Sequence, residues 1–284
     1  MGADFRFNRA VRTLPRYLSV LLLLILVTLA AAPTPQTAAE AVYPRSMAAL
    51  GDSLSQANNA CCRPGDQPAQ SWSTGDGPGD GVASHYERLL QLGPAIRGNN
   101  ANHSVSGAKA SDLPRQAAAA AGHRPEYVTV LMGANDLCTS SLETMTPVED
   151  FRASVTQALE ILDRTEPRPR VFVSSIPSLY QLWHVLREDP AAQSAWSASG
   201  ACQSMLAVSA SEEARQEVVR RQEAFNAALA QSCAQYTSCR HDGGALYAHV
   251  PSPEDMSILD YFHPSLRGQS TLADITWTEA WEAR

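Results

Sequence analysis

Short apolar runs alternate with segments of helical spacing along most of the chain. Strands are predicted at 46–50, 101–105, 127–132, 170–174 and, more weakly, 245–250. The run 127–132 is the clearest, since continuous β-forming residues are typical of a strand covered on both faces. Helices are predicted at 82–92, 112–121, 147–162, 178–187, 211–232 and 266–281. This alternation predicts an α/β fold with a mainly parallel sheet of about five strands and right-handed crossovers.

Two long stretches lack periodicity. Residues 56–81 are rich in Asn, Pro, Gly and Ser, and 189–207 is predicted to be mostly irregular. A loop as long as the first is uncommon in a compact domain unless it is functional. Its Trp72 either plugs the edge of the core or lines a pocket, and Trp183 and Trp196 would likewise suit an acyl chain or a sugar face.

The first 41 residues have the layout of a secretory signal peptide. Four arginines precede an uncharged apolar run over 18–32, and Ala39-Glu40-Ala41 fits a cleavage site, with 30–32 as an earlier option. The run falls short of the ~20 apolar residues that a membrane-spanning helix needs. We therefore expect a cleaved signal peptide over 1–41, a single domain over 42–284, and a secreted protein without stable membrane anchoring.

The charge of the chain narrows the class of partner. The formal net charge is −7, and residues 1–41 contribute four Arg against Asp4 and Glu40, so the remainder carries −9. Nucleic acids and anionic membrane surfaces are negatively charged and attract proteins rich in Lys and Arg, so neither is an expected partner. We expect a monomer that acts on a small molecule or a lipid ester.

The cysteine count indicates disulfide bonds. Six cysteines in an exported chain favour disulfides over zinc, because their spacing contains no Cys-x-x-Cys knuckle. Among the 15 possible connectivities, Cys138 with Cys202 and Cys233 with Cys239 are favoured. Adjacent Cys61 and Cys62 cannot easily share one partner, so their pairing stays open.

Polar clusters follow several predicted strands. Ser53 follows the first strand, Gly107 the second and Asn135 the third, whereas Asp260 and His263 precede the last helix. Because the carboxyl ends of parallel strands meet at one edge, these residues are expected to lie together. A serine hydroxyl needs a base and a group that orients the base, and an aspartate three residues before a histidine can supply that orientation.

In this order the clusters resemble the four marker blocks of the SGNH (GDSL) hydrolase family. The blocks are Gly51-Asp52-Ser53, Gly107, Gly133-x-Asn135-Asp136 and Asp260-x-x-His263. The resemblance covers essentially all of the chain after residue 41. It extends to Ser71-Trp72-Ser73-Thr74-Gly75, Asn102-x-Ser104-x-x-Gly107 and Cys138, as in secreted actinobacterial esterases and lipases of the family.

The resemblance implies a three-layer α/β/α flavodoxin-like fold and assigns roles. Ser53 would be the nucleophile, His263 the general base and Asp260 its orienting group. The backbone N–H groups of Ser53 and Gly107 and the side chain of Asn135 would form the oxyanion hole. Residues 55–62 depart from the commoner glycine-containing continuation of the family, which leaves the pocket wall and the substrate open.

These roles lead to a secreted, metal-independent serine carboxylic-ester hydrolase that needs no cofactor. Lipid or short acyl esters are the expected substrates, with a polysaccharide O-acetyl esterase as the alternative and a non-catalytic binding protein as a third. The remaining histidines share no ligand spacing, so core or surface roles are expected and no metal site is predicted. They are His85, His103, His123, His184, His241 and His249.

Overall fold

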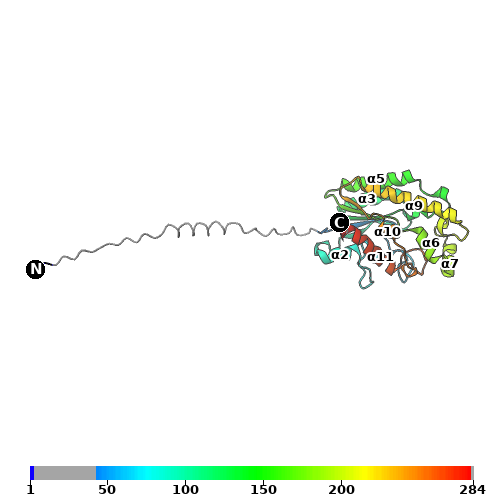
Figure 1. The fold of residues 1–284 in the computed structure, drawn as a ribbon, viewed down its shortest axis with the longest axis horizontal. Helices are drawn as coiled ribbons and strands as arrows, with labels where there is room; N and C mark the ends of the chain where they lie inside the picture. Colours follow the sequence, from blue (N-terminus) through cyan, green and yellow to red (C-terminus); the bar gives the residue numbers. More distant parts are fainter. Residues whose placement is uncertain (3–42, 283–284) are drawn as a thin grey trace. The chain divides into compact units, whose positions relative to one another are not determined.

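The computed structural model describes residues 1–2 and 43–282 (Figure 1). The predicted signal peptide over 1–41 lies outside the described residues, apart from its first two. Residues 43–282 belong to one compact unit around one sheet. Of the helices in this part of the chain, none has the length and apolar character needed to cross a bilayer.

The sheet has five strands that are all parallel. They are β1 (Met47–Gly51), β2 (Asn100–Asn102), β3 (Tyr127–Leu131), β4 (Arg170–Val173) and β5 (Cys239–His241). Their order across the sheet is β2-β1-β3-β4-β5, with β1 in register between Asn100–Asn102 on one side and Tyr127–Leu131 on the other. The predicted α/β class with a parallel five-stranded sheet is therefore confirmed.

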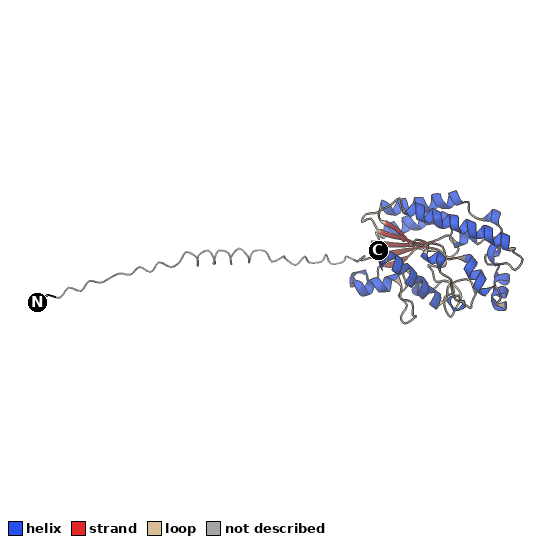
Figure 2. Cartoon of the chain, viewed as in Figure 1, coloured by secondary structure: helices blue, strands red, loops and turns tan. Residues whose placement is uncertain are grey.

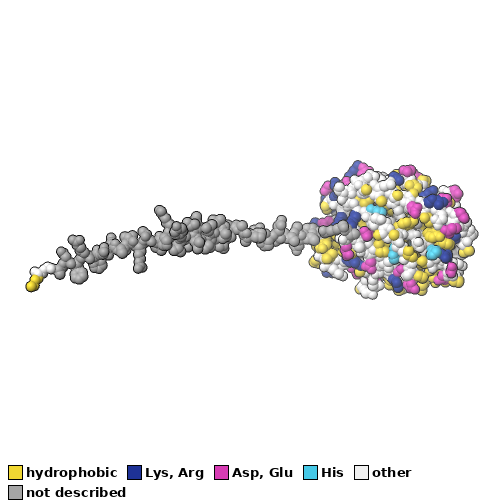
Figure 3. Space-filling model, viewed as in Figure 1, with side chains coloured by type: hydrophobic (Ala, Val, Ile, Leu, Met, Phe, Trp, Pro, Cys, Tyr) yellow, Lys and Arg dark blue, Asp and Glu magenta, His cyan; other side chains and the backbone are white. Residues whose placement is uncertain are grey.

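Helices cover both faces of the sheet (Figures 1 and 2). On one face α3, α5 and α9 lie side by side, and on the other lie α2 and α11. The α-helices are α2 (His85–Leu92), α3 (Leu113–Gly122), α4 (Ala134–Leu137), α5 (Val148–Asp163), α6 (Leu179–Leu186), α7 (Pro190–Ser199), α8 (Gln203–Leu206), α9 (Glu212–Cys233), α10 (Ala245–Ala248) and α11 (Leu266–Trp277). Figure 3 shows acidic and basic side chains interspersed on the face in view.

Alternate residues along the strands belong to two different hydrophobic clusters. Met47, Tyr127 and Phe172 point into the smaller cluster, with Leu89 of α2 and Trp277 of α11. Their neighbours along each strand belong to the larger cluster, together with residues of α3, α5 and α9. Since successive side chains of a strand point to opposite faces, strands buried on both faces must be apolar throughout. This explains why 127–132 was the clearest strand in the sequence.

The prediction of a strand at 245–250 was wrong. The fifth strand lies earlier, at Cys239–His241, and 245–248 form α10. The buried carboxylate of Asp242 holds the start of α10, because it accepts hydrogen bonds from the N–H groups of Gly244 (2.9 Å) and Leu246 (3.2 Å). A strand of three half-buried residues at the sheet edge has too little apolar character to be recognised by pattern.

The prediction that 189–207 is mostly irregular was also wrong. This stretch contains α7 and α8. Asp189 caps α7 by accepting hydrogen bonds from the N–H groups of Ala191 (2.7 Å) and Ala192 (3.3 Å), and Pro190 occupies the first helical position. The Asp-Pro pair is an N-terminal helix signal that the weak periodicity of the segment concealed.

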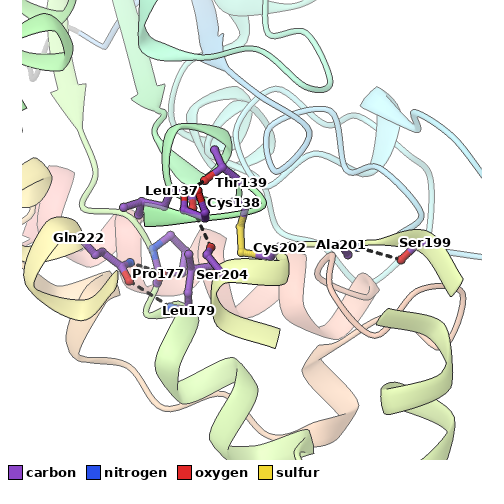
Figure 4. The surroundings of a disulfide bond; sticks show 11 residues. Leu137, Cys138, Thr139, Pro177, Leu179, Ser199, Ala201, Cys202, Ser204 and Gln222 are labelled. Carbon is purple, nitrogen blue, oxygen red and sulfur yellow. Dashed lines mark hydrogen bonds between the residues drawn. A yellow bond between two sulfur atoms is a disulfide. The ribbon is translucent and has the colours of Figure 1, made fainter. Parts of the chain in front are cut away.

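Three disulfides join the six cysteines. Both favoured pairs are confirmed: Cys138 is bonded to Cys202 and Cys233 to Cys239, whereas Cys61 is bonded to its neighbour Cys62. Figure 4 shows the first of these, where the turn after α4 meets the segment before α8. Ser204 reinforces this junction by donating its N–H to Thr139 O (3.0 Å) and its hydroxyl to Leu137 O (3.1 Å).

His85 is a fully paired core histidine. It is wholly buried, with Nδ1 at 2.9 Å from the hydroxyl of Tyr127 and Nε2 at 2.9 Å from that of Thr276. Trp72 packs edge-on against its ring. Burial, and to a lesser extent the charge of Arg88, lowers the pKa of His85 to about 3. The core interpretation of this histidine is therefore correct.

Acid should weaken the fold through His85. Its pKa is 6.5 in the unfolded chain and about 3 in the fold, so the unfolded state binds more protons between these values. The stability that the neutral ring supplies is present above pH 6.5 and is lost as pH falls toward 3. We expect His85→Gln, which does not titrate, to have lower stability at pH 7 but a shallower decline on acidification. Chemical denaturation from pH 7 to 4 measures this; parallel curves for variant and wild type would contradict it.

Candidate active site

The end of β1 is held in one conformation. Gly51 has φ +155°, and a Cβ at this position would lie 2.4 Å from Leu131 O, so no side chain fits. The buried amide of Gln116 on α3 accepts the N–H of Gly51 (2.8 Å) and donates to its carbonyl (2.9 Å). The chain that leaves the strand, with Ser53 two residues later, therefore starts from a fixed point.

Asp52 is wholly buried directly before Ser53. Its Oδ1 accepts the N–H of Leu54 at 2.9 Å, whereas its Oδ2 has no hydrogen-bond partner among the described residues. Burial raises the pKa of Asp52 to about 6, and the nearby carboxylate of Asp136 adds to this effect. Asp52 thus closes the turn that presents Ser53. Its ionised form is disfavoured because the carboxyl group is buried.

The loop before α11 forms a compact turn around Asp260. Its Oδ1 accepts the N–H groups of Phe262 and His263, both at 3.0 Å, and its Oδ2 lies 2.6 Å from Nδ1 of His263. Burial would raise the pKa of Asp260, but hydrogen bonds from His263 and Asn59 outweigh it and lower the pKa to about 2. The carboxylate is therefore ionised and fixes the imidazole ring.

The ring of His263 reaches Ser53. Its Nε2 lies 2.8 Å from Ser53 Oγ, which joins two residues 210 positions apart in the chain. Ser53 is 7% exposed, so it is largely screened from bulk water but can still be approached. A hydroxyl, an imidazole and a carboxylate in this sequence of contacts can activate a nucleophile by moving its proton to the imidazole.

The loop after β2 is tied to the turn after β3. Gly107 lies in this loop with φ +81°. The side chain of Asn135 donates to Ala108 O at 2.9 Å, and Asp136 accepts the N–H of Ala110 at 2.9 Å. The structure thus brings Asn135 against the loop that contains Gly107, at the carboxyl edge of the sheet.

Several residues that support the site were not predicted. Gln269 of α11 accepts the N–H of Trp72 (2.9 Å) and donates to Leu54 O (3.1 Å), and Trp196 of α7 donates to Tyr261 O (3.0 Å). Asn59 donates to Asp260 at 2.6 Å. For Gln116 and Gln269 the available signal was a polar residue on an apolar helix face, which does not identify the partner. Trp196 was expected only as a residue for an acyl chain or a sugar face, and Asn59 in its loop carried no signal.

A mostly apolar cavity adjoins these residues. It has a volume of about 650 Å³, counting its open mouth. It reaches the site through chain neighbours of Ser53, Asn135 and His263, namely Leu54, Ala134 and Phe262. Its other apolar lining residues are Pro177, Leu179, Leu182, Leu246, Pro251, Met256, Pro264 and Leu272. None of Trp72, Trp183 and Trp196 lines it; Trp72 and Trp196 are buried in the core.

Metal-binding side chains do not gather within the described residues. No group of three or more His, Cys, Asp or Glu residues is placed there to hold an ion. His103 and His123 form a pair with ring centroids 5.1 Å apart. Burial, and then the charge of His123, lowers the pKa of His103.

The chain is similar to known hydrolases in sequence. The sequence model of the GDSL-like Lipase/Acylhydrolase family matches residues 49–270. Human membrane-associated phospholipase B1 is 27% identical in an alignment 173 residues long that covers 49% of this chain. The chain spans only 12% of the length of that relative.

The fold is shared by a solved structure. A crystal structure from Parabacteroides merdae assigned as a GDSL-like lipase is 16% identical, with a TM-score of 0.53, over 83% of this chain and 94% of that one. The psychrotrophic esterase EstA from Pseudoalteromonas sp. is also 16% identical, with a TM-score of 0.43, over 83% of this chain and 96% of that one.

Asp52→Asn tests the buried carboxylate. Because the pKa of Asp52 rises from 3.8 to about 6 on folding, the folded state holds the proton more tightly, and the stability from this group is lost as pH rises between those values. Asparagine keeps an acceptor for Leu54 and cannot ionise. We expect the variant to gain up to about 3 kcal/mol over wild type above pH 6, from roughly 1.4 kcal/mol per pKa unit. Denaturant titrations at several pH values measure the difference; a difference independent of pH would refute this.

Proposed function

The chain belongs to the GDSL-like lipase/acylhydrolase family, and from this premise we propose that Ser53, His263 and Asp260 are the catalytic triad of a carboxylic-ester hydrolase for apolar acyl esters. The observation that carries the proposal is the continuous contact from Ser53 Oγ through the imidazole to the carboxylate, at 2.8 and 2.6 Å. Membership of the family makes the protein a serine ester hydrolase.

The reaction follows from these contacts. Ser53 attacks the ester carbonyl while its proton passes to Nε2 of His263, and the ionised Asp260 stabilises the imidazolium. His263 then protonates the departing alcohol, which leaves an acyl group on Ser53. Water, deprotonated by the same imidazole, releases the acid and restores the serine.

The negative charge that develops on the carbonyl oxygen needs donors. We assign these to the N–H groups of Ser53 and Gly107 and to the amide of Asn135. The bond from Asn135 to Ala108 O supports this assignment, because it holds the amide beside the Gly107 loop and leaves a second N–H of the same group to donate. Losing one such donor typically costs about 3 kcal/mol in the transition state.

The cavity supports an acyl chain as the group that is recognised. Its walls are mainly aliphatic, and each methylene taken from water into such a site contributes about 0.8 kcal/mol. A sugar face is usually held by aromatic rings and hydrogen-bonding groups, and none of Trp72, Trp183 and Trp196 lines this cavity. A polysaccharide O-acetyl ester therefore remains the second candidate substrate.

Secretion is also part of the proposal. The arginine-rich start and apolar run of residues 1–41 fit a signal peptide, and three disulfides suit an oxidising compartment. We propose that the protein acts outside the cytoplasm, without a metal ion.

Hydrolysis of a p-nitrophenyl ester series from acetate to palmitate tests the function. We expect activity to rise with chain length, to vanish in Ser53→Ala and to survive EDTA. A fluorophosphonate should label the wild type and not the variant. Activity confined to acetate would favour the sugar ester, loss in EDTA would refute metal independence, and a folded but unlabelled protein would refute catalysis.

A larger side chain in the cavity should shift the preference of the enzyme toward esters with shorter acyl chains. Leu182 of α6 lines it, and Leu182→Trp should exclude about four methylenes, which lowers kcat/KM for long esters on the order of a hundredfold. Acetate hydrolysis should stay within about threefold, since a short acyl group needs none of this volume. His184→Trp, on the exposed side of the same helix, is the matched control. Equal losses on acetate and long esters would place the acyl chain elsewhere.

A further inference from the structure

Asn59 touches the candidate triad from the loop after β1. Its Nδ2 donates to Asp260 Oδ2 at 2.6 Å, the same oxygen that faces Nδ1 of His263. The two residues are 201 positions apart, so the contact exists only in the folded chain. Asn59 lies in the segment that departs from the commoner sequence of the family, and none of the marker blocks includes it.

The rest of Asn59 is fixed independently of Asp260. Its Oδ1 accepts the N–H of Gly65 at 2.7 Å, its N–H donates to Gly65 O at 2.9 Å, and its carbonyl accepts the hydroxyl of Ser257 at 2.5 Å. Its φ of +57° lies in the left-handed region that asparagine tolerates better than most residues. Three hydrogen bonds therefore hold Asn59 so that its amide N–H faces Asp260.

We propose that Asn59 is a positioning residue of the catalytic machinery, which holds the carboxylate of Asp260 in the orientation that His263 requires. The inference rests on the proposed roles of Asp260 and His263. The backbone N–H groups of Phe262 and His263 hold only Oδ1. Without Asn59, the oxygen that faces the imidazole has no second donor in the described contacts, and the orientation of the carboxylate about its Cβ–Cγ bond is less tightly held.

Two substitutions distinguish the role of the amide N–H of Asn59 from that of the rest of its side chain. Asn59→Asp keeps the shape and the acceptor for Gly65 but replaces the donor with an oxygen beside Asp260. Asn59→Ala removes both contacts without adding charge. Asn58→Ala is the matched control, because Asn58 holds the same loop through Asp66 (2.6 Å) and does not contact Asp260.

We expect Asn59→Ala to lower kcat for the preferred ester on the order of tenfold to a hundredfold with KM little changed, since a donor to a charged group is lost. Asn59→Asp should show a larger deficit at alkaline pH, where two carboxylates face each other, and a smaller one as the pair takes up a proton. The deficit of Asn59→Ala should lack this recovery. Asn58→Ala should stay within about threefold of wild type, because its side chain holds Asp66 and does not contact Asp260.

A second readout needs no substrate. The proton between His263 Nδ1 and Asp260 Oδ2 gives a far-downfield ¹H resonance when the imidazole is protonated, and removal of the second donor should move it in Asn59→Ala but not in Asn58→Ala. The positioning role is refuted if the resonance is unmoved, or if both Asn59 variants share one pH-independent deficit. A wild type that hydrolyses no ester would instead refute the proposed function, and the resonance would still decide the role of Asn59.

Discussion

The contact between Ser53 and His263 is the constraint on which the site depends. It joins the end of the first strand to the loop before the last helix, and neither segment can hold it alone. Hydrogen bonds from Gln116 fix Gly51 on one side, and the turn around Asp260 fixes the imidazole on the other. The position of each group is thus set by its neighbours before a substrate arrives, which is the condition for efficient proton transfer.

Polar groups in the interior do much of this positioning. Gln116 and Gln269 are buried, and the amide of each forms hydrogen bonds with two backbone groups. A buried amide that pairs with one backbone N–H and one backbone carbonyl favours a single arrangement of the chain. In a shifted arrangement the amide oxygen, the amide N–H and both backbone groups would be buried without partners. Asp52 is different, since one of its oxygens lacks a partner among the described residues and burial raises its pKa.

Most of the cavity lies outside this framework. The cavity is lined mainly by residues of α6, α10 and α11 and of the loops between them. Ser53 lies just after the end of β1, and Asp260 and His263 lie in the turn before α11. Under the proposed function, such a division would let the acyl preference change by substitution in α6 without disturbing proton transfer. It also explains why chain neighbours of the triad, Leu54 and Phe262, are the points where the two meet.

The sequence by itself determined the fold class, the buried strands and the order of the polar clusters, because strand periodicity and glycine-bounded turns are local properties. It also led to two of the three disulfide pairs. Only the tertiary structure decided that 239–241 is the edge strand, that Trp72 is core, and that Asn59 meets Asp260. These depend on contacts between residues distant along the chain, and a half-buried polar side chain carries no local sign of its partner. The same reason applies to the cavity, whose walls come from segments that no sequence pattern links.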